Sequence, residues 1–286
     1  MRRVLKWIGI VLGSLIGLVL VAAVVFFVKG SRDVAGTVKV PTDHVDVPTN
    51  EASLARGQEL VTALCTGCHG QNLGGEVIVD DPMLGTIYAA NLTSGEGGVL
   101  ASHTDDDLVR SIRHGVAPDG RALLVMPSRA FNIFSAEDLG SIIAYLRTLP
   151  PIDNTVPPVK LAVIGKVFAG ADPTGDMFSA HQIDHNQPFP TMPEIGANAE
   201  YGAYFSGFCK QCHGKDLTGG FGPNLTMSGE LAGWSEQDFV KTLETGVTPS
   251  GHELNPENMP WKDLAKLDQD ELKGVFLYLR TLNTKP

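Results

Sequence analysis

The interpretation of this chain is decided by one stretch, Cys65-Thr66-Gly67-Cys68-His69, whose pattern recurs at Cys209-Lys210-Gln211-Cys212-His213. Two thiols three residues apart on one helical turn can add across both vinyl groups of a porphyrin, and the adjacent imidazole then reaches the iron. The two stretches use all four cysteines of the chain, so no disulfide is available. They predict two covalently bound haem c groups, attached through Cys65 and Cys68 and through Cys209 and Cys212, with His69 and His213 as iron ligands.

A Cys-x-x-Cys pair by itself has two other common interpretations. It forms half of many zinc sites, and it is the redox-active pair of thioredoxin-like proteins. The histidine that follows each pair favours haem, and the repetition of the whole pattern strengthens that choice. Because thioether attachment takes place outside the cytoplasm, the chain is expected to carry an export signal.

An uncharged apolar run extends from Trp7 to Val28, with three basic residues before it. At about 1.5 Å per helical residue, this run spans the roughly 30 Å hydrocarbon core of a bilayer. It predicts a transmembrane anchor over residues 1–29. The alternative is a cleaved signal peptide, for which Val21-Ala22-Ala23 offers small residues at the cleavage site. The basic N-terminus places that end in the cytoplasm, so the remaining chain is expected on the periplasmic side of a bacterial inner membrane, with a single crossing.

The part of the chain beyond the anchor is strongly acidic. Residues 1–32 hold five of the 22 Lys and Arg and none of the 32 Asp and Glu, which leaves 17 basic and 32 acidic residues and a net charge of -15. Nucleic acid is therefore not an expected partner. Residues 30–50 contain prolines and no sustained periodicity, and they predict a tether.

The two haem stretches lie in two copies of one unit. Met126-Pro127 matches Met259-Pro260, and the segment 145–149 matches 278–282, all at one constant offset. Asn-Leu-Thr also occurs once in each copy. This repeat predicts two units of the same fold.

The repeat predicts the domain organisation. We expect the first unit at residues 51–150, the second at 196–286, and a proline-rich connector at 151–195. Extra residues occur around 80–90 in the first copy. Apolar residues recur at helical spacing, and strand-like alternation is scarce, so the prediction is an all-α fold: a transmembrane helix followed by two tandem helical domains.

Four helices, and the first residues of two more, can be predicted in detail. We expect helices at 54–64 and 105–114 in the first unit and at 201–208 and 235–245 in the second. The final helix of each unit is expected to begin at an N-cap, and these caps are Ser135 and Asp268.

The connector is expected to contain one helix and to pack on the units. The helix is predicted over 159–169, because proline is tolerated in a first turn. Phe168, Phe178 and Phe189 are expected to be buried, which argues against a flexible linker.

Each unit offers a methionine as the second iron ligand. Met126 and Met259 occupy equivalent positions, and both precede proline, which holds the preceding residue out of the helical region and so on an extended loop. A lone methionine usually fills a core, but the repeat favours ligation here. Thioether sulfur favours ferrous iron, so a His/Met pair raises the reduction potential.

Other side chains in the sequence could compete for these positions. Four methionines have no counterpart in the other copy and are interpreted as packing residues: Met83, Met177, Met192 and Met227. Five histidines could serve as distal ligands in principle but are interpreted as ordinary polar residues: His103, His114, His181, His185 and His252. His44 lies in the tether and is expected to be solvated.

The ordered motifs of each copy resemble class I c-type cytochromes. Asn-Leu-Thr, a helix, Gly-x-x-Pro-(Asp/Ser)-Gly, Met-Pro and a helix ending in Tyr-Leu-Arg-Thr-Leu follow one another in both. The pattern is similar to the membrane-bound cytochrome c subunits that accept electrons from bacterial alcohol and related sugar or aldehyde dehydrogenases, which commonly carry three haems. It covers residues 51–149 and 196–282.

This resemblance implies a particular helix crossing and a particular ligand set. The first and last helices of each unit should cross where a glycine meets an aromatic residue, here Gly57 with Tyr145 and Gly202 with Tyr278. Each iron should have one His and one Met ligand.

The expected function is electron transfer without catalysis. We expect a membrane-anchored periplasmic dihaem cytochrome c that passes single electrons from a quinol-oxidising complex or a dehydrogenase to an oxidase or another cytochrome, alone or as a subunit of a membrane complex. The alternative is a dihaem enzyme of the peroxidase or thiosulfate-oxidising type, which needs one open or unusually ligated haem. A haem-based sensor or purely structural subunit is a third hypothesis.

Overall fold

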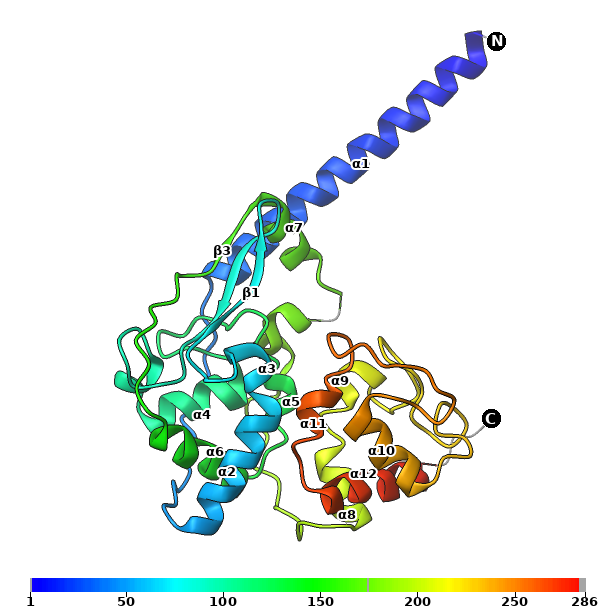
Figure 1. Ribbon diagram of the computed structural model, residues 1–286. Coiled ribbons are helices and arrows are strands. Elements are labelled where there is room, and N and C mark those ends of the chain that lie inside the picture. Colours follow the sequence, from blue (N-terminus) through cyan, green and yellow to red (C-terminus); the bar gives the residue numbers. More distant parts are fainter. Residues whose placement is uncertain (1, 174, 283–286) are drawn as a thin grey trace.

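A computed structural model describes residues 2–173 and 175–282. Its first helix, α1 (Arg2–Ala35), extends away from the rest of the molecule (Figure 1). Among the described residues, α1 is the one helix long and apolar enough to cross a membrane. It continues to Ala35, beyond the predicted end at residue 29, and its side chains are exposed over most of its length.

The first helical unit, residues 51–149, is built around a pair of crossing helices. These are α2 (Glu51–Leu64) and α6 (Ala136–Thr148). A Cβ added at Gly57 would collide with the carbonyl oxygen of Ser141 and lie 2.8 Å from Cβ of Tyr145, so the crossing requires glycine and the expected pairing is confirmed. The remaining helices of the unit are α3 (Thr66–His69), the 3-10 helix η1 (Val99–Ala101), α4 (Asp105–His114) and α5 (Ser128–Phe131).

The second helical unit, residues 199–282, repeats this arrangement. Its crossing helices are α8 (Ala199–Phe205) and α12 (Gln269–Thr281). A Cβ added at Gly202 would collide with the carbonyl oxygen of Gly274 and lie 2.9 Å from Cβ of Tyr278, which confirms the second expected crossing. The other helices are α9 (Lys210–His213), α10 (Glu236–Thr245) and α11 (Trp261–Leu264). Residues 283–286 of the predicted second domain lie outside the described residues.

The two predicted N-caps are confirmed, whereas α2 and α8 begin earlier than the predicted residues 54 and 201. The side chain of Ser135 accepts a hydrogen bond from the Asp138 nitrogen at the start of α6, and the side chain of Asp268 accepts one from the Asp270 nitrogen at the start of α12. Each cap satisfies a backbone donor that a helix N-terminus leaves free.

The all-α prediction is wrong in one region. Strands β1 (Glu76–Asp81), β2 (Gly85–Ala89) and β3 (Lys160–Leu161) form an antiparallel sheet in that order. The hairpin is made by the residues that only the first copy contains. Its tight turn is held by Asp81, whose carboxylate accepts from the nitrogens of Met83 and Leu84. The β-branched run before this turn favours a strand, but it is too short to show clear alternation.

The expected tether is not solvated over its whole length. After α1, the chain runs along the first unit, where the Val38 nitrogen donates to the Gly120 carbonyl oxygen and Asp43 pairs with Arg113 at 2.9 Å. His44 keeps the expected exposure, with its side chain 74% accessible.

The connector also differs from the prediction in part. Its helix α7 (Val163–Ala171) begins later than residue 159, because Lys160 and Leu161 pair with β2 instead. The 3-10 helix η2 (Asp176–Gln182) follows. Phe178 is buried, as expected. Phe189 is partly buried, under the guanidinium of Arg113, and Phe168 is 58% exposed.

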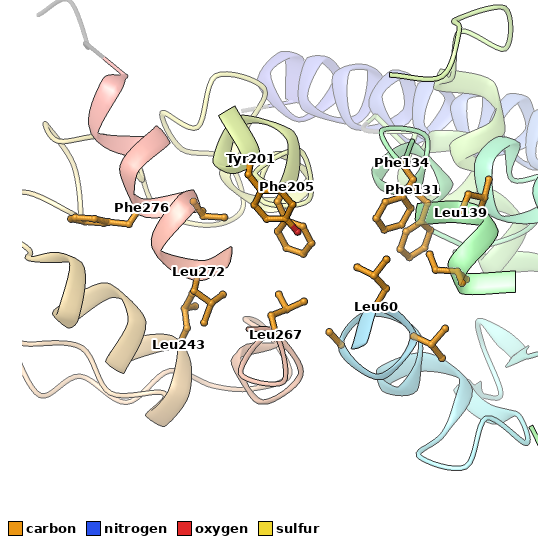
Figure 2. Close-up of a cluster of buried hydrophobic side chains, with 14 of the residues drawn as sticks. Leu60, Phe131, Phe134, Leu139, Tyr201, Phe205, Leu243, Leu267, Leu272 and Phe276 are labelled. Carbon is orange, nitrogen blue, oxygen red and sulfur yellow. The ribbon is translucent and has the colours of Figure 1, made fainter. Parts of the chain in front are cut away.

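One hydrophobic core runs through both helical units (Figure 2). Phe208 connects the two units. The centre of its ring lies 5.6 Å from the ring centre of Phe131 and 5.1 Å from that of Phe134 in the first unit, and 5.3 Å from that of Phe205 in the second. Because the core is continuous, the division into two independent domains stays a prediction.

Candidate functional sites

The first unit contains a pocket at the predicted site. Cys65, Cys68, His69 and Met126 all line it, between α2, α4, α5 and α6. The structure therefore brings together all four residues that the sequence predicted for this site. The rest of the wall is largely apolar and includes Leu92, Leu108, Ile112, Phe131, Phe134 and Leu146. An apolar pocket with two thiols, an imidazole and a thioether fits a porphyrin and its iron.

The orientation of His69 suits an iron ligand. Its Nδ1 lies 2.8 Å from the carbonyl oxygen of Ala90, and because a carbonyl can only accept, Nδ1 carries the proton. The lone pair is then on Nε2, the atom free to bind a metal. Burial lowers the pKa of His69, against the opposing effect of that hydrogen bond, so the ring is held in its neutral, ligating form.

The second unit reproduces this geometry. Nδ1 of His213 lies 2.8 Å from the carbonyl oxygen of Pro223, and burial again lowers the pKa of the histidine. Behind each haem stretch the chain turns through a leucine with positive φ, Leu73 at 61° and Leu217 at 60°. The two copies therefore share this strained backbone conformation at the equivalent leucine.

Gly222 lies against the ring of His213. A Cβ at this position would be 2.8 Å from Cε1 and Nδ1 of the histidine. A larger residue would push the ring, so this glycine is a positioning residue that the sequence did not reveal, since nothing in the first copy matches it by motif.

The two Met-Pro segments also share one conformation. The nitrogen of Ser128 donates to the Met126 carbonyl oxygen at 2.8 Å, and that of Trp261 donates to the Met259 carbonyl oxygen at 2.7 Å. The sequence placed both methionines on extended chain directly before the final helix. In the structure the one-turn helices α5 and α11 come between, because each proline opens a new helical turn.

Met259 packs against the hydrophobic core, as Met126 does, and both are partly buried. Among the other methionines, Met227 packs on the core as expected. Met83, however, is 60% exposed at the tip of the hairpin, so its interpretation as a packing residue is wrong.

The surroundings of the cysteines argue against the thioredoxin and zinc interpretations on different grounds. A thioredoxin-like pair requires a reactive thiolate, which a lowered pKa favours. Burial instead raises the pKa of the Cys65 thiol to about 12 and that of Cys209 to about 11. Within residues 2–173 and 175–282, no three His, Cys, Asp or Glu side chains are grouped to hold a metal ion.

The remaining histidines have different environments. His103 lines the first pocket. His114 is fully buried, contrary to its interpretation as an ordinary polar residue of a surface helix: Nε2 lies 3.1 Å from an Asp43 oxygen, and Nδ1 lies 3.0 Å from Nδ1 of His185. Both nitrogens of His114 are therefore engaged. His181 stacks on Phe178.

Each haem stretch contacts the Met-Pro region of the other unit. From the second unit, Lys266 donates to Oγ1 of Thr66 at 3.1 Å. From the first unit, Arg129 donates to Oε1 of Gln211 at 3.1 Å. These reciprocal contacts place the two candidate sites on either side of a common interface.

These features define a class of protein, the c-type cytochromes, in which haem serves electron transport. A family model described as "Cytochrome C oxidase, cbb3-type, subunit III" matches residues 52–146 and 196–279. The matched segments cover more than half of the chain and contain both haem stretches. The chain belongs to this family.

Three relatives are named as cytochrome subunits. The fructose dehydrogenase cytochrome subunit of Gluconobacter japonicus is 26% identical over 86% of this chain and 56% of its own length. The cytochrome c subunits of an alcohol dehydrogenase (quinone) from Gluconacetobacter polyoxogenes and of a gluconate 2-dehydrogenase from Pantoea cypripedii are each 28% identical, over 88% and 84% of this chain and 60% and 62% of their own lengths. The chain thus spans less than two thirds of each relative. The similarity is to proteins named as cytochrome subunits of dehydrogenases.

Proposed function

We propose that the chain is a membrane-anchored dihaem cytochrome c that relays single electrons. Haem c in the first unit would be attached to Cys65 and Cys68, with His69 and Met126 as iron ligands. The observation that carries this proposal is the apolar pocket lined by these four residues. When bound, the haem supplies an iron that changes oxidation state by one electron.

The second site is proposed by equivalence. Cys209 and Cys212 would attach the haem, and His213 and Met259 would bind its iron. The support is the repeated local geometry: the same Nδ1-to-carbonyl distance at the histidine and the same backbone hydrogen bond at the methionine. With two protein ligands, neither iron would have an open position for substrate, which favours a carrier over the peroxidase-type alternative.

The protein residues would tune and insulate these sites. The Ala90 and Pro223 carbonyls hold the two histidines in one tautomer and orientation. The apolar wall excludes water, which contributes to a high potential together with the thioether ligand. Phe131 and Phe134 line the first pocket and meet Phe208, which directly precedes Cys209, so a continuous aromatic contact joins the two sites.

The proposed donor is a membrane dehydrogenase or a quinol-oxidising complex, and the proposed acceptor is an oxidase or another cytochrome. The similarity to cytochrome subunits of fructose, alcohol and gluconate dehydrogenases supports a dehydrogenase as donor. The proposed location is the inner membrane, with the helical units on the periplasmic side. The apolar α1 and the extracytoplasmic chemistry of haem attachment support it.

The ligand assignment can be tested by the long-wavelength charge-transfer absorption that reports methionine sulfur on ferric haem. Met126→Ala and Met259→Ala should each remove about half of this band, and the double variant should remove all of it. Met227→Ala is the matched control, since it removes a partly buried methionine of the second unit that has no counterpart in the first. A wild-type band corresponding to one haem only would overturn the dihaem His/Met proposal and favour the enzyme alternative.

A further inference from the structure

Helix α7 is held against the end of the candidate membrane helix (Figure 1). A Cβ added at Gly170 would collide with the carbonyl oxygen of Phe26 and lie 2.8 Å from the nitrogen of Gly30. The two backbones therefore touch through glycine. The apolar run of α1 ends at Val28, and Lys29 follows it. The contact places α7 at the depth where hydrocarbon would give way to lipid headgroups.

The side of α7 that does not pack is apolar and exposed. The buried residues of the helix are small: Gly165, Ala169 and Gly170. Val163, Ile164 and Phe168 are 65%, 37% and 58% exposed. At about 100° per residue, these three side chains lie within an arc of roughly 140° on one face. A helix that packs through glycine and alanine and exposes larger apolar side chains has the pattern of a helix lying in a membrane interface.

The hairpin turn adds a fourth exposed apolar residue beside this face. The Leu84 carbonyl oxygen accepts from the nitrogen of Ala162, and a Cβ at Gly165 would collide with that same oxygen. Next to Leu84, Met83 is 60% exposed. The turn between β1 and β2 thus sits at the N-terminal end of α7.

We propose that Val163, Ile164, Phe168 and Met83 form an interfacial docking surface that enters the headgroup and upper acyl region of the bilayer. The occupant is lipid, because the surface is continuous with α1, whose exposed apolar side chains require lipid around them. Lys166, whose Nζ lies 5.7 Å from the centre of the Phe27 ring, adds a cation at the headgroup level. This inference rests on the proposed membrane anchoring.

Two attachments would restrict how the protein turns on the membrane. A single helix leaves the attached units free to rotate about its axis, whereas a second, in-plane contact removes that freedom. The hairpin belongs to the first helical unit, so the docking surface keeps this unit beside the bilayer. The first candidate haem site would then be the one nearer to membrane-bound partners.

The test uses full-length, haem-loaded protein in liposomes of phosphatidylcholine and phosphatidylglycerol. A nitroxide is attached to Phe168→Cys, and its collision rates with oxygen and with a water-soluble nickel chelate are compared. Phe221→Cys is the matched control, because Phe221 is 81% exposed but lies between α9 and α10 in the second unit. We expect a several-fold higher oxygen-to-nickel ratio at Phe168, with a similar increase at Val163→Cys.

The outcomes are distinguishable. Equal ratios at Phe168 and Phe221 overturn the docking surface. A Phe168 label that is water-accessible in liposomes but shielded from both reagents in native membranes shows that a protein partner covers this face, which also overturns it. A label at Ile16→Cys in α1 reports the anchor: if it is water-accessible, the anchoring and the surface both fail. Labelling of the unmodified chain would reveal free cysteines and would count against the haem proposal alone.

Discussion

The two helical units share a backbone plan but meet each other with different side chains. Arg56 in α2 and Tyr201 in α8 occupy equivalent positions, each directly before the crossing glycine, and Asp138 corresponds to Glu271 in the final helices. Arg56 pairs with Asp138 at 2.8 Å and with Glu271 at 2.6 Å, and the hydroxyl of Tyr201 donates to Glu271. One buried cation from the first unit therefore serves a carboxylate from each unit.

Tyr204 and Glu59 also occupy equivalent positions in the two units, and each binds the start of a helix in the other unit. The hydroxyl oxygen of Tyr204 accepts from the backbone nitrogen of Ser135 at 3.0 Å, and Oε1 of Glu59 accepts from the backbone nitrogen of Asp268 at 2.8 Å. Each unit thus caps the final helix of the other. The two caps occupy equivalent positions, but one acceptor is a hydroxyl group and the other is a carboxylate.

This difference has a physical reason. When two copies of a repeat pair face to face, equivalent residues approach one another, so identical copies would bring two guanidinium groups or two unpaired carboxylates into a buried space. An uncompensated buried charge is costly. Divergence to arginine on one side and tyrosine on the other supplies complementary partners, which explains why the copies keep their folding motifs but not their interface residues.

The largest expected effect tests whether the two units are equivalent as haem sites. Replacing Cys65 and Cys68 by alanine should lower the haem content from two per chain to one, and replacing Cys209 and Cys212 should do the same, because each pair provides the only thioether links of its unit. The haem-to-protein ratio after alkaline pyridine treatment measures this. A pair of substitutions that leaves two haems per chain would contradict the equivalence.

The next effect tests the shared cation. Above about pH 7, where Glu271 is ionised, Arg56→Met should lower the free energy of unfolding by about 3–5 kcal/mol, because Asp138 and Glu271 stay buried without their common partner. Tyr201→Phe removes the hydrogen bond that the hydroxyl donates to Glu271 and the one that it accepts from Arg56, and each should cost about 1.5–3 kcal/mol. Urea denaturation gives both values. Arg121→Met is the control, since its pair with Asp119 is more than half exposed and should contribute about 1 kcal/mol or less.

A smaller effect tests the shared backbone plan. Gly57→Ala and Gly202→Ala should each destabilise the fold by about 1–3 kcal/mol, because the added methyl group meets a backbone carbonyl of the crossing helix. Gly13→Ala in α1, where nothing lies within 4 Å of the added Cβ, should be neutral. Thermal unfolding is sufficient to compare the three. If only one of the two crossing substitutions lowered the melting temperature, the two helix crossings would differ in how closely their backbones pack.

The smallest effect for each step of the measurement concerns pH and centres on Glu271 of the second unit, whose carboxyl meets Glu59 and Arg56 of the first. Burial, together with the hydrogen bond that protonated Glu271 donates to the neighbouring Glu59, raises the pKa of Glu271 from 4.5 to about 7. Between these values the folded chain holds a proton that the unfolded chain has lost, so the free energy of unfolding falls as pH rises from about 4.5 to 7. The slope from one proton is at most about 1.4 kcal/mol per pH unit.

Glu271→Gln should flatten this part of the stability profile, measured by urea denaturation at several pH values. Glutamine keeps a polar side chain of the same size and does not titrate. An unchanged slope in the variant would assign the pH dependence to other groups.

Local features could be predicted from sequence where a few adjacent residues determine them. The caps at Ser135 and Asp268 and the helix at 105–114 follow from side chain-to-backbone hydrogen bonds and apolar spacing. The glycine crossings followed from the family resemblance. The hairpin was missed because its short strands occur in one copy only and carry little alternation.

The burial of His114 and the exposure of Phe168 could not be predicted, because each depends on segments distant in sequence. His114 is enclosed by Asp43 and His185, which come from the tether and the connector. Phe168 is exposed because the packing face of α7 is occupied by α1 and the hairpin turn.

By itself, the sequence determined which reactive groups each proposed site can offer, since thiols, imidazole and the Met-Pro step are set by residue type and spacing. It also determined that two units share one fold, because a repeated pattern of caps, glycines and apolar positions repeats the local energetics. The tertiary structure alone decided how the units face each other through Arg56 and Glu271, and where α7 lies against α1. Those arrangements depend on packing and charge complementarity between distant segments, which no local pattern encodes.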